Sequence, residues 1–335
     1  MERAWPSEAL DFEAAVRGAL LRAGGVDLAR RCEADPTLRE SVVQPLLEGL
    51  GVFELDIAGG EVEAAAAALA MTAAGSVVCP WPLVQQLAVP RATRDELQAL
   101  YLRDGYVRRA EHLDVAGRAA AVDLMSGEAC RLRTVGPLSR MPLDPFGVRC
   151  EIGAGTFELP NVVHAYVVLA SFWTAGALAS ARDLAAEHAR TRRQFDRRIA
   201  EFGAIQWHLS DIAAAHDGLW ELASFSLARM IDGRLAPVDT LALYFTMLES
   251  ASVVLSHAHQ VLAAVGLCDE HDLTVLNRHL QPILRRPCGM ARILSLLAEE
   301  VARSGFDNLY PIPAAGPGNG RATRANRAEP VLEGL

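Results

Sequence analysis

The sequence predicts a mainly α-helical protein in three consecutive parts: N-terminal helices, a small β-sheet and a C-terminal bundle of long helices. Alanine and leucine dominate the composition, and aromatic residues make up only 6% of it, which favours helices over sheets. Strand-like patterns are confined to the middle of the chain. With 335 residues, of which 51% are hydrophobic, the chain can bury a core shared by two or three packed units.

The first part, residues 1–90, is expected to be a helical domain. Apolar residues recur at helical spacing up to Gly24-Gly25, where the first helix should end. Asp35-Pro36-Thr37 is a start signal for a second helix. Further helices are expected over 61–74, which is nearly pure alanine, and over 83–89.

The middle part, residues 91–156, is expected to be a reduced β domain. Short apolar runs separated by Gly, Pro and Asp are typical of strands and turns, and they suit roughly four or five strands. The runs begin at Val107 and continue at 119–124, 130–135 and 147–152.

The third part, residues 157–308, is expected to be a helical bundle, because its helical patterns are long and their connections are short. The predicted helices cover residues 161–192, 200–231, 237–265, 271–285 and 288–304. The tail from 309 to 335 lacks an apolar period, which predicts disorder.

Charge and composition narrow the function classes. A net charge of −9 argues against general nucleic-acid binding. The six cysteines form no CxxC pair and the histidines show no metal pattern, so we expect neither a metal site nor a disulfide framework. Acidic residues near the N-terminus exclude a signal peptide, and the apolar stretches, about a dozen residues long, are short of the ~20 of a membrane span. We therefore expect a cytoplasmic protein.

The strongest motif is Arg192-Arg193-Gln194-Phe195, followed by Ile199, Phe202 and Gln206. It resembles the acyl-CoA dehydrogenase signature R-x-Q-F-G-x-P-I-x-x-F-Q, with Asp196 in place of the glycine. The resemblance implies that Arg192 and Gln194 reach the diphosphate of FAD and that Phe195 packs on the cofactor. A forked guanidinium suits phosphate oxygens, and an aromatic face suits a flat ring system. The alternative is a solvated basic helix end, which arginines stabilise without any ligand.

A second motif runs from Gln260 to Gly266 and is followed by Glu270-His271. It resembles Q-x-H-G-G-x-G-F-x-x-E-H of the same family, and the resemblance implies that Gln260 and Gly266 also lie near the FAD. Paired glycines would let the backbone approach the cofactor closely. Here Ala263-Ala264 stands in their place.

The catalytic base of the family has no counterpart in this sequence. The reaction removes an α-proton while a hydride leaves the β-carbon, so a carboxylate must lie beside the substrate. One family position is the glutamate of a Y-E-G-T loop, and residues 304–308 offer no such loop. The other position is occupied by Tyr166, with His164 nearby; Glu158 and Asp307 are the nearest acids, but neither is at a family position.

The segment that holds the flavin ring in the family, T-E-x-x-A/G-S-D, is also missing between Val89 and Gly105. The chain thus resembles the short subunit of heteromeric, sterol-degrading acyl-CoA dehydrogenases. This implies an acyl-CoA dehydrogenase-like fold with a reduced middle sheet and a C-terminal four-helix bundle, and an α,β-desaturation of an acyl-CoA thioester with FAD. It also implies a full-length partner subunit that supplies the carboxylate in a heterotetramer, and an electron-transfer flavoprotein or similar acceptor.

Two alternatives remain open. One is a homo-oligomeric acyl-CoA dehydrogenase with an unrecognised base. The other is a non-catalytic scaffold that has lost the cofactor.

Overall fold

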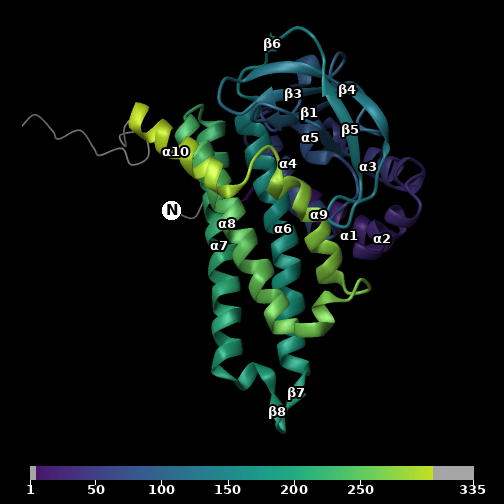
Figure 1. Ribbon diagram of the computed structural model, residues 1–335, viewed down its shortest axis with the longest axis vertical. Coiled ribbons are helices and arrows are strands. Elements are labelled where there is room, and N and C mark those ends of the chain that lie inside the picture. Colours follow the sequence, from purple (N-terminus) through teal and green to yellow (C-terminus); the bar gives the residue numbers. More distant parts are fainter. Residues whose placement is uncertain (1–4, 305–335) are drawn as a thin grey trace, which may run out of the picture.

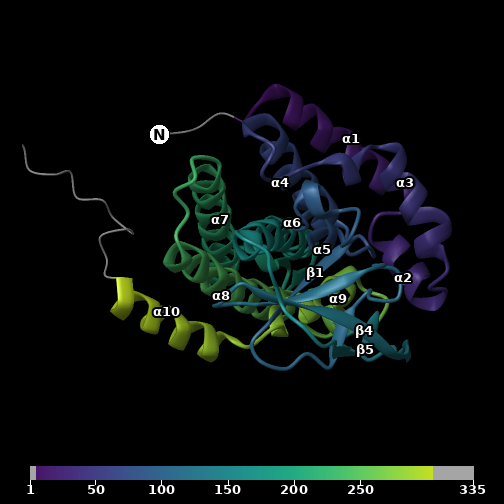
Figure 2. The same cartoon turned by 90° about the horizontal axis from the view of Figure 1, so that it is seen from above.

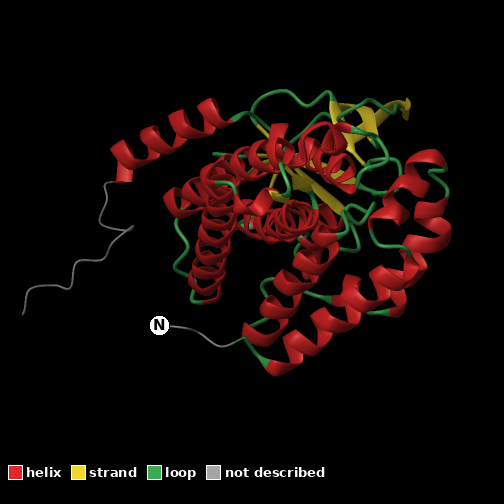
Figure 3. Cartoon of the chain, turned by 90° about the horizontal axis from the view of Figure 1, so that it is seen from below, coloured by secondary structure: helices red, strands yellow, loops and turns green. Residues whose placement is uncertain are grey.

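The computed structural model describes residues 5–304, and its elements follow the three predicted parts along the chain (Figure 1). Helices make up most of it, and the strands gather in one region among them, except for a separate two-stranded hairpin (Figure 3). The predicted disordered tail, 309–335, lies outside the described residues, and the predicted domain boundaries stay a prediction.

The N-terminal part consists of helices with short connections. They are α1 (Ser7–Ala23), α2 (Val26–Ala34), the π-helical turn η1 (Arg39–Val43), α3 (Gln44–Gly49), the 3₁₀ turn η2 (Val52–Glu54), α4 (Glu61–Ser76), α5 (Leu83–Leu87) and the 3₁₀ turn η3 (Arg91–Thr93). Gly24 and Gly25 end α1 as predicted, but α2 then begins at once and was not predicted. Both glycines have positive φ (128° and 58°), so two residues suffice for the corner between the helices.

Helix α4 packs directly against the first long helix of the bundle, α6 (Val162–Thr191). Two glycines make the close approach possible. A Cβ added to Gly75 would lie 1.9 Å from the carbonyl oxygen of Trp173, and one added to Gly176 would lie 2.1 Å from that of Thr72. The backbones of α4 and α6 therefore touch where no side chain fits between them.

The sheet has six strands in the order β1-β3-β4-β5-β2, with β6 paired to β4. The strands are β1 (Ala99–Arg103), β2 (Arg109–Glu111), β3 (Ala119–Asp123), β4 (Glu128–Leu138), β5 (Gly147–Ile152) and β6 (Phe157–Glu158). β1 runs parallel to β3 and was not predicted. Four of its five residues are buried, so it lacks the alternation of a half-exposed strand.

The C-terminal part is built from α6, α7 (Gly203–Ile231), α8 (Pro237–Leu262), α9 (Asp272–Arg285) and α10 (Met290–Ser304). These helices lie within a few residues of the predicted ranges. α6, α7 and α8 run side by side, and α10 packs on α8 (Figures 1 and 2). The 3₁₀ turn η5 (Ala263–Leu267) follows α8, and a small hairpin of β7 (Arg193–Gln194) and β8 (Arg197–Arg198), followed by the 3₁₀ turn η4 (Ile199–Glu201), joins α6 to α7.

Helix α9 ties the N-terminal helices to the bundle through buried charges. Glu33 of α2 accepts hydrogen bonds from Arg278 Nε (2.7 Å) and His279 Nε2 (2.8 Å). Burial would raise the pKa of Glu33, but the hydrogen bonds from His279 and Arg278 outweigh it and lower that pKa. Arg30 of α2 also pairs with Asp272 at the start of α9. We call α9 with these contacts the α9 clasp.

Two helical segments are long and apolar enough to cross a membrane by length and composition, Val162–Thr191 and Pro237–Leu267. However, 83% and 67% of their most apolar windows are buried inside the fold, as expected of core helices.

Candidate functional site

The predicted FAD motif lies at the end of the bundle farthest from the sheet, where the β7–β8 hairpin forms the tip of the molecule (Figure 1). Arg192 ends α6 in an extended conformation, and β7 pairs with β8 through Gln194 and Arg197. We call residues 192–198 the arginine hairpin. The sequence pattern predicted a turn here but not the two strands.

The turn of the arginine hairpin presents an aromatic side chain to solvent. Phe195 and Asp196 are its two central residues, and both have positive φ (50° and 61°), as a type I′ turn requires. Asp196 thus keeps the backbone conformation of the glycine that it replaces. Phe195 is 87% exposed, and its ring meets that of Phe202 in a T-shaped arrangement with 6.3 Å between the ring centroids. A strained, exposed phenylalanine points to a role in binding rather than in folding.

The arginines of the hairpin have two different roles. Arg193 donates to the carbonyl of Asp196 (2.6 Å) and Arg197 stacks on Phe202, so both hold the turn. The side chains of Arg192 and Gln194 are exposed and make no hydrogen bond within residues 5–304. Because residues two apart on an extended segment share a face, these free donors project together.

The second motif also keeps the backbone of the family pattern. Ala263, at the end of α8, has φ 51° and ψ −135°, a conformation that strongly favours glycine. Gln260 is exposed on the last turn of α8. Gly266 is buried, and a Cβ there would lie 2.7 Å from that of Leu262, so packing within the fold explains this glycine.

His188, on the last turn of α6, lies directly before the first motif. Its carbonyl accepts the backbone N–H of Arg192 (2.9 Å). Burial, then the nearby charges of Arg192 and His271, lower the pKa of His188. Free guanidinium and amide donors beside an exposed ring thus gather at one end of the bundle, and this donor set fits the diphosphate and a flat ring of FAD.

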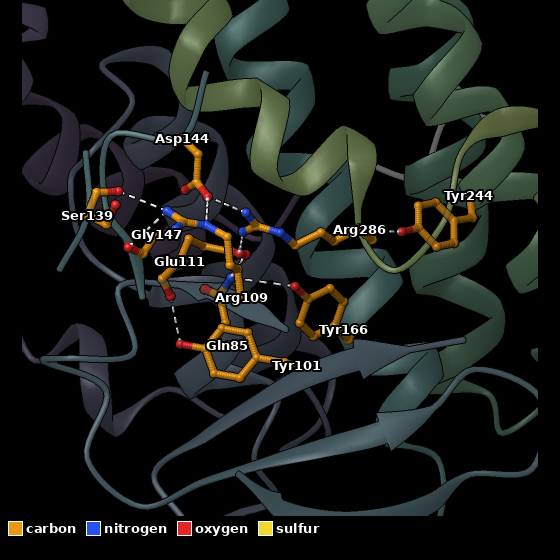
Figure 4. Close-up of polar contacts among 10 residues, drawn as sticks. All are labelled: Gln85, Tyr101, Arg109, Glu111, Ser139, Asp144, Gly147, Tyr166, Tyr244 and Arg286. Carbon is orange, nitrogen blue, oxygen red and sulfur yellow. Dashed lines mark hydrogen bonds and ion pairs between the residues drawn. The ribbon is translucent and has the colours of Figure 1, made fainter. Parts of the chain in front are cut away.

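A second polar site was not predicted. It lies where the sheet meets the bundle (Figure 4). Arg286, after α9, pairs with Glu111 of β2 (2.5 Å) and with Asp144 of the β4–β5 loop. Arg109 pairs with Asp144 (3.2 Å), and Gln85 of α5 donates to Glu111 (2.8 Å). We call these five residues, with Tyr166, the junction cluster.

The junction cluster occupies the second family position for the base. Gln85 Nε2 lies 3.5 Å from the hydroxyl of Tyr166 and also donates to Glu111, so the Gln85 amide lies between the phenol and the carboxylate. Burial, then the charge of Glu111, raises the pKa of Tyr166 far above its usual value, so the phenol stays neutral and cannot serve as the base. Tyr244 donates to the carbonyl of Arg286 (2.6 Å) and fixes the loop that carries the guanidinium.

The other candidates for the base lie elsewhere. His164 contacts Thr240 (2.5 Å) and lines, with Glu158, a separate cavity of about 230 Å³. Asp307 lies outside the described residues. Within residues 5–304 no group of three or more His, Cys, Asp or Glu is arranged to hold a metal ion.

Sequence reasoning missed the junction cluster because its charged residues look like ordinary surface positions in the sequence. Arg109 and Glu111 alternate with buried Ala110 on a short strand, and Arg286 follows another arginine. Only the meeting of five separate elements makes them a site. A charged residue directly before Pro287 was the single available signal, and it is a weak one.

Comparison with known families supports the resemblance that the motifs predicted. The family model described as acyl-CoA dehydrogenase, C-terminal domain, matches residues 168–284, a range that contains both motifs. The comparison with curated proteins found no match.

Solved structures share the fold over nearly the whole chain. A steroid acyl-CoA dehydrogenase, Tcur3481-Tcur3483, is 14% identical, with 88% of this chain and 98% of that chain covered and a TM-score of 0.74. The ChsE4-ChsE5 complex from Mycobacterium tuberculosis is 16% identical, with 91% and 100% covered and a TM-score of 0.72. Butyryl-CoA dehydrogenase from Megasphaera elsdenii is 11% identical, with 90% and 100% covered and a TM-score of 0.67. The predicted fold class is therefore confirmed: the chain has the acyl-CoA dehydrogenase fold.

Proposed function

We propose that the chain is the supporting subunit of a heteromeric, FAD-dependent acyl-CoA dehydrogenase whose full-length partner supplies the catalytic carboxylate. The observation that carries this proposal is the arginine hairpin. Phe195 is 87% exposed in a conformation that costs energy, and the donors of Arg192 and Gln194 beside it have no partner in the described part of the chain. Such a tip fits a ligand seated in another subunit.

The solved relatives support the same assembly. One is named as the ChsE4-ChsE5 complex, and another as a steroid acyl-CoA dehydrogenase with two component names. A further structure of this fold is described as an FAD complex of PigA, and another as an electron-transferring flavoprotein. By analogy we propose FAD as the cofactor, an acyl-CoA thioester as the substrate and an electron-transfer flavoprotein or similar protein as the acceptor. We further propose a heterotetramer in the cytoplasm that acts on a lipid or steroid acyl group.

The chain's own residues would bind and orient the cofactor. When bound, FAD supplies the acceptor for the hydride of the substrate's β-carbon. Arg192 and Gln194 would hold the diphosphate, Phe195 would cover one side of the cofactor, and Gln260 would approach from the last turn of α8. No described residue of this chain is assigned the removal of the substrate's α-proton, because Tyr166 occupies the family position and its phenol is neutral.

One observation favours the alternative of a homo-oligomeric enzyme. Glu111 is a buried carboxylate beside Tyr166, so the fold does place an acid near a family base position. The pairing argues against it: a base must be free to take a proton, and both oxygens of Glu111 are bound, by Arg286 and Gln85. Desaturation by this chain alone that is lost in Glu111→Gln would establish the alternative.

The deciding experiment expresses the chain alone and together with candidate full-length subunits encoded beside it. The expected result is a yellow complex only on co-expression, with one FAD and one catalytic carboxylate per pair of subunits. Full activity of the chain by itself, with one FAD bound to each subunit, would refute the proposal. A colourless complex that binds no flavin would indicate the scaffold alternative.

A further inference from the structure

The junction cluster fills the space between sheet and bundle from the inside. Arg286 reaches into it from the α9–α10 connection and places its two terminal nitrogens on carboxylates from two different parts of the sheet, Glu111 and Asp144 (Figure 4). Tyr166 and Gln85 close the opposite side.

The space around these side chains is small on the inner side and open on the outer side. On one side of Glu111 is a cavity of about 30 Å³, the size of a water molecule, lined by residues such as Trp81, Trp173 and His279. On the other side is an outward-facing pocket of about 370 Å³, lined by Tyr101, Tyr106, Arg109, Glu111, Tyr166 and Arg286. The guanidinium of Arg286 and the carboxylate of Glu111 lie between that pocket and the interior.

The charges of the junction cluster balance one another. Arg109 and Arg286 face Glu111 and Asp144, and the only further cation on the pocket wall, Arg108, is exposed and stacks on Tyr106. The four charges of the cluster are therefore paired with one another, and of the described residues on the pocket wall only Arg108 carries a charge without an ion pair. Moving Arg286 aside would leave two buried carboxylates with fewer partners, which proteins tolerate poorly.

We propose that Arg286 is a fixed plug: held by Glu111 and Asp144, it closes the inner end of the outward-facing pocket, so that an acyl group cannot enter between sheet and bundle in this chain. This inference rests on the proposed function and adds to it that each pair of subunits has a single acyl-CoA site, which belongs to the partner. Arg286 is a residue that excludes substrate from this chain, not a catalytic residue.

Two double variants separate the plug from the general stability of the cluster. Arg286→Ala with Glu111→Ala removes the plug and leaves the Arg109–Asp144 pair intact. Arg286→Met with Glu111→Gln removes the same charges but keeps the space filled. Octanoyl-pantetheine, which carries an acyl thioester without the nucleotide, is titrated calorimetrically into each purified complex, and into the chain alone if no partner co-purifies.

The wild-type complex and the filled variant should bind one octanoyl-pantetheine per pair of subunits, and the opened variant two. When the chain is measured alone, the wild type and the filled variant should bind no octanoyl-pantetheine and the opened variant should bind one. Two sites in the wild-type complex, or no gain in an opened variant with unchanged helix content, would overturn the plug. These counts do not depend on turnover, so they can fail while the assembly proposed above stands.

If the opened variant does not fold, the wild type still decides. 5-Fluorotryptophan placed at Trp81, which lines the small inner cavity and not the outward-facing pocket, reports on the closed interior by its ¹⁹F signal. Saturating octanoyl-pantetheine should leave that signal unchanged, with 3-fluorotyrosine at exposed Tyr106 as a control for contact with the pocket mouth. A shifted Trp81 signal would mean that the acyl group passes Arg286, and the proposal would be wrong.

Discussion

Replacing Ala263 by glycine should stabilise the protein. Ala263 ends α8 with φ 51° and ψ −135°, a region in which a Cβ is strained by about 1–3 kcal/mol. Glycine removes this strain but gives up roughly 0.5–1 kcal/mol because it is more flexible in the unfolded chain. The net gain should be up to about 2.5 kcal/mol, which for a chain of this size raises the melting temperature by up to about 4 °C.

The measurement is urea unfolding followed by circular dichroism, supported by thermal melts. The matched control is Ala264→Gly, one residue further on in η5, where φ is not positive, so glycine should only destabilise. If Ala263→Gly lost as much stability as Ala264→Gly, the turn would not be strained. The backbone at Ala263 would then not be one that requires glycine.

Three further predictions concern cofactor binding, pH and packing. Arg192→Ala should weaken flavin binding in the co-expressed complex by about 1.5–3 kcal/mol. Arg190→Ala removes another exposed charge, one that is already paired with Glu187, and should leave flavin binding unchanged. An equal loss in both variants would indicate a purely electrostatic effect. Burial, then Arg39 and His279, holds the pKa of His112 well below its usual value, so the unfolded chain binds a proton that the folded chain does not. Unfolding free energy should therefore fall as the pH drops from about 7 to 5, with a shallower slope in His112→Asn; an unchanged slope would assign the effect to other groups. Gly176→Ala should lower the free energy of unfolding by about 3 kcal/mol or more, because its Cβ would meet the Thr72 carbonyl. Gly218→Ala, where nothing lies within 4 Å of the added Cβ, should raise it by up to about 1 kcal/mol through helix propensity. Similar melting temperatures of the two variants would contradict the close contact of α4 and α6.

The long helices could be predicted from the sequence, because apolar residues that recur at helical spacing over some thirty positions are compatible only with a helix. The sequence was sufficient for the location of both motifs as well, although the roles of Arg192 and Gln260 stay predictions. It failed at β1, whose burial on both faces hides the period of a strand. It also failed at α2, which begins directly after a glycine corner.

The junction cluster shows a different limit. Gln85, Glu111 and Arg286 are far apart in the chain, and each is unremarkable among its neighbours. Their meaning comes from being packed together at low solvent exposure, which depends on how the sheet is set against the bundle. Local pattern cannot supply that information, whereas it can supply a turn or a helix end.

The α9 clasp also has a consequence for the dynamics of the chain. One short helix carries the buried partners of Glu33 near its middle and leads directly into Arg286, so it cannot detach from the N-terminal helices while staying bound to the sheet. Its opening should therefore be one cooperative event, in which the amides of α9 and β2 exchange with deuterium at a common rate. Because η5 leads through a short connection into α9, a cofactor bound at Gln260 and η5 would slow that exchange across the whole unit.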